Sequence, residues 1–182
     1  MAGQVVISPT LRKRVAGIPE PVRKFAELIK PGEKVLDLGA GTGHKTKYLV
    51  ENTKGEIYAC DYYEPFVDEL RKIVDGRAFK CDVRALHNVP NDYFDKVLIW
   101  HVMMFISKED LDKAIREIKR ITKPGGLILY GFYRVKTALN PDFADPEKFK
   151  EASREVCEKT GKVIEFKCRG KDLCWCFVVN TE

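Results

Sequence analysis

Residues 35–43 read Val-Leu-Asp-Leu-Gly-Ala-Gly-Thr-Gly, and this stretch decides the fold of the chain. A buried strand pattern runs directly into three glycines at alternate positions, and helical spacing then follows to about Asn52. Such glycines let a ligand approach the backbone, because side chains would collide there. An ordinary tight strand-to-helix turn is the alternative explanation. The dinucleotide-binding pattern Gly-x-Gly-x-x-Gly fails, because the sixth position counted from Gly39 is His44.

Outward from this stretch, short apolar runs alternate with helical patterns, which indicates an α/β fold with parallel strands. The last two apolar runs flank Arg169-Gly170-Lys171-Asp172 and should pair as an antiparallel hairpin. We therefore predict five parallel strands followed by a C-terminal antiparallel hairpin, with helices on both faces. The expected strands are 34–38, 56–61, 78–82, 94–102, 127–133, 162–168 and 173–180, and the expected helices begin near Pro21, His44, Glu64, Ser107 and Asp145.

Length and composition fit one globular domain. The 182 residues are 45% hydrophobic, which is too apolar for disorder and enough for a core without disulfide staples. The longest apolar run, 97–106, is half the length of about 20 residues that a membrane span needs. The first residues lack the basic-then-apolar order of a signal peptide. We expect a single cytoplasmic domain over 1–182, with a core at 33–180 and an N-terminal segment, 1–20, that can act as a lid.

Charge and amino-acid usage add two weaker expectations. The net charge of +5 comes from 32 Lys and Arg against 27 Asp and Glu spread along the chain, as is usual for soluble domains. A nucleic-acid partner is therefore the less favoured alternative, and we expect no membrane partner. One Gln beside 21 Lys and 15 Glu is a bias reported for heat-loving organisms, so we expect a thermophilic source.

The segment Asp37-Leu38-Gly39-Ala40-Gly41-Thr42-Gly43 resembles the first motif of class I S-adenosylmethionine (SAM) dependent methyltransferases. The resemblance extends over residues 33–180. It includes Asp61 closing the second strand, Asp82 after the third, Phe94-Asp95 opening the fourth, and Lys123-Pro124-Gly125-Gly126 before the fifth. The terminal hairpin also matches that fold. The resemblance implies a Rossmann-like doubly wound sheet, SAM as the cofactor and methyl transfer as the activity.

Two acids follow neighbouring strands at the edge of the sheet where a cofactor would lie. Asp61 comes 22 residues after Gly39, and a carboxylate there can accept from both ribose hydroxyls of an adenosine. The resemblance implies that Asp82 accepts from the adenine amino group, with Val83 against the ring. Asp61 as a helix cap and Asp82 as a turn acid are the alternatives. Asp37 either orients the glycine loop and the amino-acid end of the cofactor or is structural.

His101 lies where the family places residues that face the reacting centre. It is either a base or a hydrogen-bonding orienter for the acceptor, or it is a satisfied histidine at a strand end. Tyr133 is a candidate for the acceptor pocket, whereas Tyr130 fits the core better. The predicted cofactor residues are Asp37, Gly39, Ala40, Gly41, Gly43, Asp61, Tyr62, Asp82, Val83 and His101; the catalytic residue is His101; the substrate residue is Tyr133; no metal ligand is predicted.

The acceptor is narrowed by what the chain lacks. The resemblance links methylation of exocyclic amino groups to an Asn/Asp-Pro-Pro-aromatic run at the end of strand four, where this chain reads Trp-His-Val-Met at 100–103. We expect methyl transfer to O, N or S of a small-molecule or protein acceptor. A catalytically inactive SAM-binding partner subunit and, less favoured, an NAD-dependent oxidoreductase are the alternatives. The sequence assigns no oligomeric state.

The six cysteines contain no Cys-x-x-Cys pair, which argues against a structural zinc site. We expect them to be buried small apolar residues. A disulfide within the terminal hairpin is the alternative if the source is a hyperthermophile.

Overall fold

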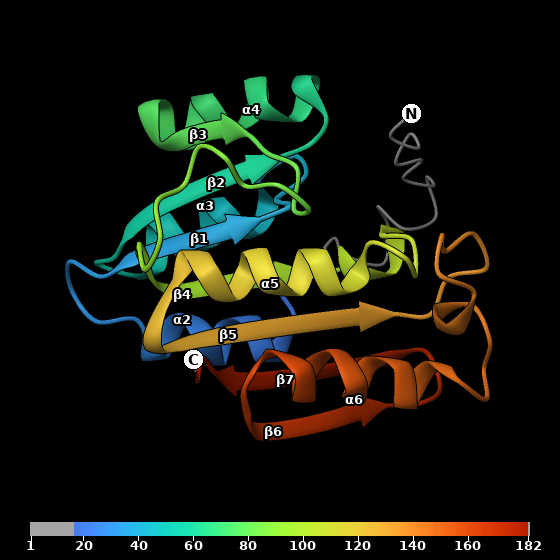
Figure 1. Ribbon diagram of the computed structural model, residues 1–182. Helices are drawn as coiled ribbons and strands as arrows, with labels where there is room; N and C mark the ends of the chain where they lie inside the picture. Colours follow the sequence, from blue (N-terminus) through green and yellow to red (C-terminus); the bar gives the residue numbers. More distant parts are fainter. Residues whose placement is uncertain (1–16, 182) are drawn as a thin grey trace.

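A computed structural model describes residues 17–181 and consists of one seven-stranded sheet covered by helices (Figure 1). The strand order is β3-β2-β1-β4-β5-β7-β6. The strands are β1 Lys34–Leu38, β2 Glu56–Asp61, β3 Ala78–Lys80, β4 Phe94–Trp100, β5 Thr122–Tyr133, β6 Lys162–Arg169 and β7 Leu173–Val179. The helices are α2 Glu20–Leu28, α3 His44–Asn52, α4 Glu64–Val74, α5 Leu111–Ile121 and α6 Phe149–Thr160, with short 3-10 turns η1 Asp75–Arg77, η2 Met103–Phe105 and η3 Pro141–Phe143.

The order of the strands confirms the predicted fold. All four pairings among the first five strands are parallel, and β7 runs antiparallel to both β5 and β6. The chain builds outward from β1 to β3, returns to β4 beside β1, and then builds in the other direction. The crevice between the ends of β1 and β4 is therefore the switch point at which open α/β sheets bind ligands.

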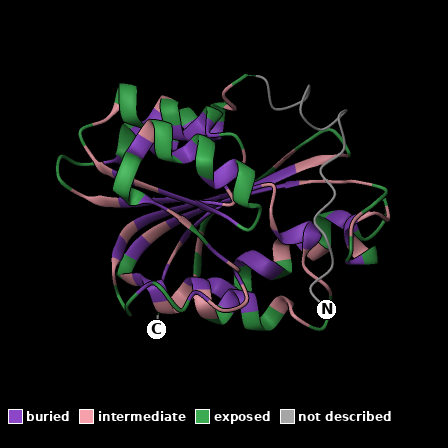
Figure 2. Cartoon of the chain, turned by 90° about the horizontal axis from the view of Figure 1, so that it is seen from above, coloured by how far each residue is buried: buried purple, intermediate pink, exposed green. Residues whose placement is uncertain are grey.

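Helices cover both faces of the sheet, as Figure 2 shows by the buried strands between two helical layers. One core lies under α5 and α6, where Ile118 and Val156 are buried against strand side chains. The other core lies under α2, α3 and α4, where Phe25, Leu49 and Leu70 are buried. Burial on both faces explains why β4 is apolar along its length.

Several predicted boundaries were wrong. The third strand ends at Lys80 and not at 82, and the fourth ends at Trp100 and not at 102. The helix α5 begins at Leu111 and not directly after Ser107, and a turn precedes it in which the Ser107 Oγ accepts from the Asp110 backbone N–H. Pro124-Gly125-Gly126 does not precede the fifth strand but forms a bulge inside β5, between the pairs Phe94–Thr122 and Lys96–Leu127. The helix α6 begins at Phe149, since Asp145 is used in the turn before it.

The expectation of unpaired cysteines was also wrong. All six cysteines form disulfides: Cys60–Cys81, Cys157–Cys176 and Cys168–Cys174. The last bond joins directly paired residues of the terminal hairpin. It is the hairpin disulfide that the sequence analysis gave as the alternative for a hyperthermophilic source. The first bond joins the ends of β2 and β3, because Cys60 is the second-last residue of β2 and Cys81 directly follows β3.

No helix among residues 17–181 has the length and apolar character needed to cross a membrane. The predicted N-terminal lid, 1–20, lies almost entirely outside the described residues, which begin at Gly17.

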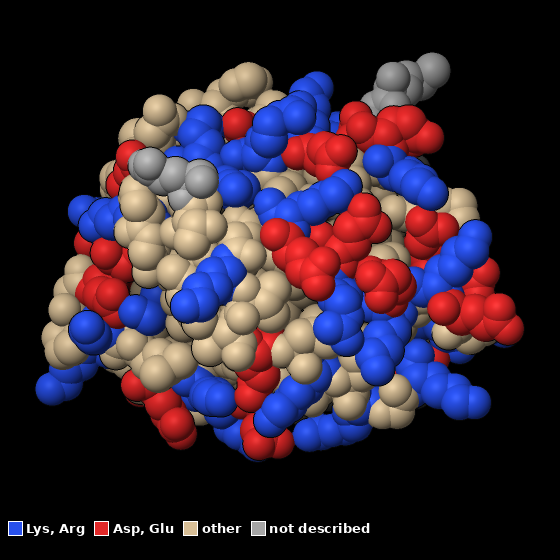
Figure 3. All heavy atoms as spheres, turned by 60° about the horizontal axis from the view of Figure 1, so that its bottom comes forward, with Lys and Arg blue, Asp and Glu red and all other residues tan. Residues whose placement is uncertain are grey.

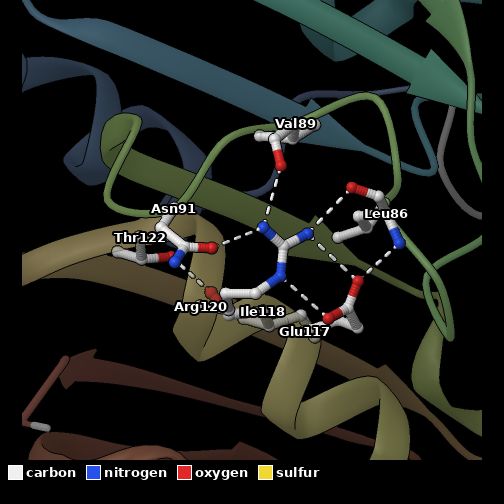
Figure 4. A network of polar contacts seen from close by, with 7 residues as sticks. All are labelled: Leu86, Val89, Asn91, Glu117, Ile118, Arg120 and Thr122. Carbon is white, nitrogen blue, oxygen red and sulfur yellow. Dashed lines mark hydrogen bonds and ion pairs between the residues drawn. The ribbon is translucent and has the colours of Figure 1, made fainter.

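The connection between β3 and β4 is fastened to α5 by one arginine (Figure 4). The Arg120 guanidinium donates to the carbonyls of Leu86 and Val89, each at 2.8 Å, and to the Asn91 side chain at 2.9 Å. The Glu117 carboxylate accepts from both Arg120 and the Leu86 backbone N–H. This network holds in place the loop that follows β3 and contains Asp82 and Arg84.

We expect Arg120→Met to lower the free energy of unfolding by about 2–3 kcal/mol, because two backbone carbonyls and a carboxylate lose their donor. Urea unfolding of the two proteins measures the difference. Arg116→Met, at an exposed position one turn earlier, is the matched control and should change stability by less than about 0.5 kcal/mol. Equal losses in both variants would contradict a structural role for the network.

Candidate active site

A cavity of about 400 Å³ opens at the carboxyl ends of the parallel strands. Its size falls in the range of about 300–1,000 Å³ that is typical of small-molecule sites. Most of the predicted site residues line it: Gly39, Ala40, Gly41, Asp61, Tyr62, Asp82, Val83 and His101. The sheet edge therefore brings together residues from the loops after β1, β2, β3 and β4.

The glycine loop is docked onto the end of β2 by its backbone. The N–H groups of Gly39 and Ala40 both donate to the Cys60 carbonyl, at 2.9 and 3.0 Å. Gly41 adopts φ +61°, and an added Cβ there would meet no atom within 4 Å. The loop thus leaves open space over its backbone at the wall of the cavity, which fits a ligand held close to the main chain.

Asp61 ties this loop to the second strand. Its Oδ2 accepts from the Gly41 N–H at 2.9 Å, and its Oδ1 accepts from the Tyr63 N–H at 3.0 Å. Burial raises the pKa of Asp61, and the two backbone donors oppose that rise. Each carboxylate oxygen can accept more than one hydrogen bond, so Asp61 retains acceptor capacity toward the cavity that it lines.

Asp82 is held by a neighbour that the sequence did not single out. The Arg84 guanidinium donates to Asp82 through Nε and Nη2, at 3.0 and 2.8 Å, and to Asp110 through Nη1 at 3.1 Å. These bonds hold the pKa of Asp82 below its usual value. Asp82 is therefore ionised and oriented, with part of its acceptor capacity already used.

His101 combines an unusual backbone with unpaired ring nitrogens. Its φ of +70° lies in the left-handed region, and its N–H donates to the Gly131 carbonyl at 2.8 Å. Among the described residues neither ring nitrogen has a hydrogen-bond partner, although both are shielded from solvent. Burial, aided by the charge of Lys45, lowers the pKa of His101 to about 3. The imidazole is thus neutral at pH 7, with one donor and one acceptor.

Three predicted site residues do not line the cavity. Asp37 lies beneath the loop and accepts from the Thr46 hydroxyl at 2.7 Å, while burial raises its pKa. An added Cβ on Gly43 would collide with the Ile73 side chain, so this glycine allows α3 and α4 to pack. Tyr133 packs edge-on against the His101 ring, with the ring centroids 4.7 Å apart. Tyr130 is fully buried and bonded to Thr160, as expected for a core residue.

Lys45, Trp100 and Arg84 are lining residues that the sequence reasoning missed. Trp100 leaves its indole N–H without a partner among the described residues, as His101 does its ring nitrogens. Buried polar groups are normally paired, so unpaired ones in residues that line a cavity are typical of a functional site. The feature of the sequence that could have identified Lys45 is its position two residues after Gly43, the last glycine of the loop.

We expect His101→Asn to reduce the acid sensitivity of the fold. The natural His101 binds a proton in the unfolded chain near pH 6.5 but in the folded chain only near pH 3, so its contribution to stability is lost as the pH falls between those values. Asn tolerates the positive φ and does not titrate. The slope of unfolding free energy against pH, from urea unfolding, should fall by up to about 1.4 kcal/mol per pH unit between pH 6 and 4. Equal slopes would contradict a neutral, buried His101.

Comparisons with known proteins agree with this geometry. Residues 36–130, just over half of the chain, match the family model described as methyltransferase domain. The malonyl-[acyl-carrier protein] O-methyltransferase of Halorhodospira halophila is 33% identical over 122 residues, 65% of this chain and 39% of that protein. The ubiquinone/menaquinone biosynthesis C-methyltransferase UbiE of Bordetella avium is 30% identical over 63% of this chain and 47% of its own. The chain thus spans less than half the length of these relatives.

Solved structures share the whole fold. A SAM-dependent methyltransferase from Aquifex aeolicus superposes with a TM-score of 0.73 at 20% identity, over 97% of this chain and 100% of that one. The N-methyltransferase NodS from Bradyrhizobium japonicum, solved with S-adenosyl-L-homocysteine, gives a TM-score of 0.70 at 15% identity over 96% and 89%. Together with the family match, the glycine loop and the two strand-end acids, these likenesses identify the chain as a member of the class I SAM-dependent methyltransferase family.

Proposed function

We propose that this chain binds SAM across the carboxyl ends of β3, β2, β1 and β4 and transfers its methyl group to O, N or S of a small-molecule or protein acceptor. The observation that carries the proposal is the Asp61 carboxylate, which is fixed between the glycine loop and the end of β2 and faces the cavity. Family membership supports the cofactor.

The residues present fit this cofactor in the order in which its parts are joined. Asp82 and Val83 suit the adenine, Asp61 the two ribose hydroxyls, and the open backbone of the glycine loop the amino-acid tail. When bound, SAM supplies an electrophilic methyl group on a sulfonium. The chain's part is then to hold the acceptor in line with that group and to keep water out.

His101 suits orientation of the acceptor better than proton removal. With a pKa of about 3 it is a weak base at neutral pH, so it gives an acceptor a hydrogen bond without taking its proton. Trp100 also lines the cavity, and its N–H lacks a partner among the described residues. Phe105, Ile106 and Leu139 give this end of the cavity apolar walls.

A protein-borne or small-molecule acceptor is favoured by the surface and by the relatives. Basic and acidic side chains are intermingled on the face shown in Figure 3, so the net charge of +5 is not gathered there into the single-sign field that nucleic-acid binding needs. The relatives include a malonyl-acyl-carrier-protein O-methyltransferase and a ubiquinone/menaquinone biosynthesis C-methyltransferase, and a probable tRNA methyltransferase is also among them. We therefore propose a class of acceptor and not a single compound.

We also infer a thermophilic source and a cytoplasmic location. Intracellular proteins of hyperthermophiles are disulfide-rich, so three disulfides and the Lys- and Glu-rich composition are compatible with each other.

We expect Asp61→Ala to weaken binding of S-adenosylhomocysteine by about 1–3 kcal/mol, because charge-assisted hydrogen bonds to the ribose are lost. Calorimetric titration of the purified protein measures this, with NAD⁺ titrated in parallel. Asp68→Ala, an exposed acid on α4, is the matched control and should leave the affinity unchanged. Unchanged affinity of the Asp61 variant would remove this residue from the site, and binding of NAD⁺ alone would overturn the proposed cofactor.

We expect His101→Asn to lower turnover about 10- to 100-fold while changing the affinity for S-adenosylhomocysteine by less than about threefold, because the lost contact is to the acceptor. Formation of S-adenosylhomocysteine in an acceptor screen measures turnover. A parallel loss of cofactor affinity would assign His101 to the cofactor pocket. Tight binding without turnover of any acceptor would favour the inactive partner subunit.

A further inference from the structure

The disulfide between Cys60 and Cys81 lies at the candidate site. Cys60 is in the last turn of the β2 strand path, and Cys81 directly follows β3 and lines the cavity. Each cysteine directly precedes one of the two acids that the proposed function assigns to the cofactor, Asp61 and Asp82. The other two disulfides belong to α6, β6 and β7, at the opposite end of the strand order. A role in the site can therefore be tested separately from a general role in stability.

The backbone attachment of Asp82 to the sheet is short. The strand β3 has three residues and lies at the edge of the sheet, and its pairing with β2 ends at Asp61 and Lys80. Beyond that pair the Cys81 N–H donates to the Asp61 carbonyl at 2.9 Å, and the chain then leaves the strand. The disulfide adds a covalent link at this point and holds the Cα atoms of Cys60 and Cys81 5.6 Å apart. It therefore limits how far Asp82 can move away from Asp61.

The same disulfide is linked to the glycine loop through Cys60. The Cys60 carbonyl accepts from the N–H groups of Gly39 and Ala40, and the residue has no exposed surface. Cys60 is thus held by the core, whereas Cys81 lies at the wall of the cavity. The bond couples the ends of β1, β2 and β3, across which the cofactor is proposed to bind.

We propose that the Cys60–Cys81 disulfide positions Asp61 and Asp82 for the cofactor, and that reduction of this bond weakens cofactor binding. The inference rests on the proposed function, since it concerns regulation of the same site. When the bond is broken, the two sulfur atoms separate to van der Waals contact. The displacement falls on the short edge strand, because Cys60 is fixed in the core. Asp82 then loses its fixed distance from Asp61.

A dithiol reductant of the thioredoxin class supplies the two electrons for this step. One of its thiolates attacks a sulfur of the disulfide, so that the S–S bond breaks and a mixed disulfide forms. The second thiol of the reductant then displaces the protein sulfur, and the reductant leaves as a disulfide. Its two protons end on the thiols of Cys60 and Cys81.

The coupling between the bond and the ligand is reciprocal, because both act on one thermodynamic cycle. A ligand that binds the oxidised chain more tightly than the reduced chain makes the disulfide harder to reduce by the same free energy. For this two-electron couple, a tenfold difference in affinity corresponds to a midpoint potential about 30 mV lower at saturating ligand. A disulfide that only stabilises the fold gives no such shift while the reduced chain stays folded.

Calorimetric titration with S-adenosylhomocysteine compares the oxidised natural chain, the chain reduced with dithiothreitol, the double variant Cys60→Ala/Cys81→Ala and the control Cys168→Ala/Cys174→Ala. The first double variant keeps the other two disulfides, so it tests this bond alone. Alkylation of free thiols and peptide mass spectrometry show which bonds are open, and graded dithiothreitol buffers give the midpoint potential with and without ligand. Thermal unfolding checks that each protein is folded, and Cys81→Ser replaces the first double variant if that one is not.

We expect the dissociation constant of S-adenosylhomocysteine to rise about 10-fold on reduction and in the Cys60→Ala/Cys81→Ala variant, and by less than about twofold in the control. The midpoint potential should fall by about 30 mV with saturating ligand. Equal affinities with an unshifted potential would overturn the inference and leave the bond as a stabiliser of the fold. Free thiols at Cys60 and Cys81 in the oxidised natural chain would also overturn it. If the natural chain binds no S-adenosylhomocysteine in either state, the proposed function itself fails, and the inference fails with it.

Discussion

The hydrogen bonds between the glycine loop and the end of β2 are the constraint on which the site depends. The Cys60 carbonyl accepts from Gly39 and Ala40, and the next residue, Asp61, accepts from Gly41. Parallel pairing of β1 with β2 brings the ends of both strands to one edge, so these bonds form without a long connection. They set the position of the carboxylate, the open backbone of the loop and the start of α3 together. A ligand that spans the two strands therefore meets a surface that is already formed.

Polar groups that would be costly elsewhere are concentrated at this edge. Four of the five shielded side-chain atoms without a partner among the described residues belong to Asp37, Trp100 and His101. His101 adds a left-handed backbone conformation, which costs about 1–3 kcal/mol for a residue other than glycine. The two buried cores offset these costs, and Arg120 holds the β3–β4 connection through the carbonyls of Leu86 and Val89 (Figure 4). Strain and unpaired groups at one edge of an otherwise consistent fold are typical of a functional site.

The fold and the place of the site could be predicted because they depend on local spacing. The glycines at 39–43 and the apolar runs required only the periodicity of strands and helices. Roles that depend on packing between distant segments could not be predicted in this way. Gly43 looked like a ligand contact, but the position of α4 turns it toward Ile73. Lys45 was not predicted, since the helix that contains it is polar in sequence, but the structure buries it. The cysteine pairs likewise depend on register, which brings Cys168 opposite Cys174.

The charge states of the residues that line the cavity near the end of β4 constrain the proposed chemistry more than the identity of any single residue does. His101 is neutral and only weakly basic at pH 7, so it provides no strong base at the end of β4. A weakly basic imidazole cannot remove a proton from an alcohol at neutral pH, but it can orient a nucleophile that is already ionised or one that loses its proton after methylation. Rate enhancement then depends on alignment and exclusion of water rather than on proton transfer. Within the proposed function, acceptors that need no base, such as a carboxylate, a thiolate or an amine, are therefore favoured over an unactivated hydroxyl group.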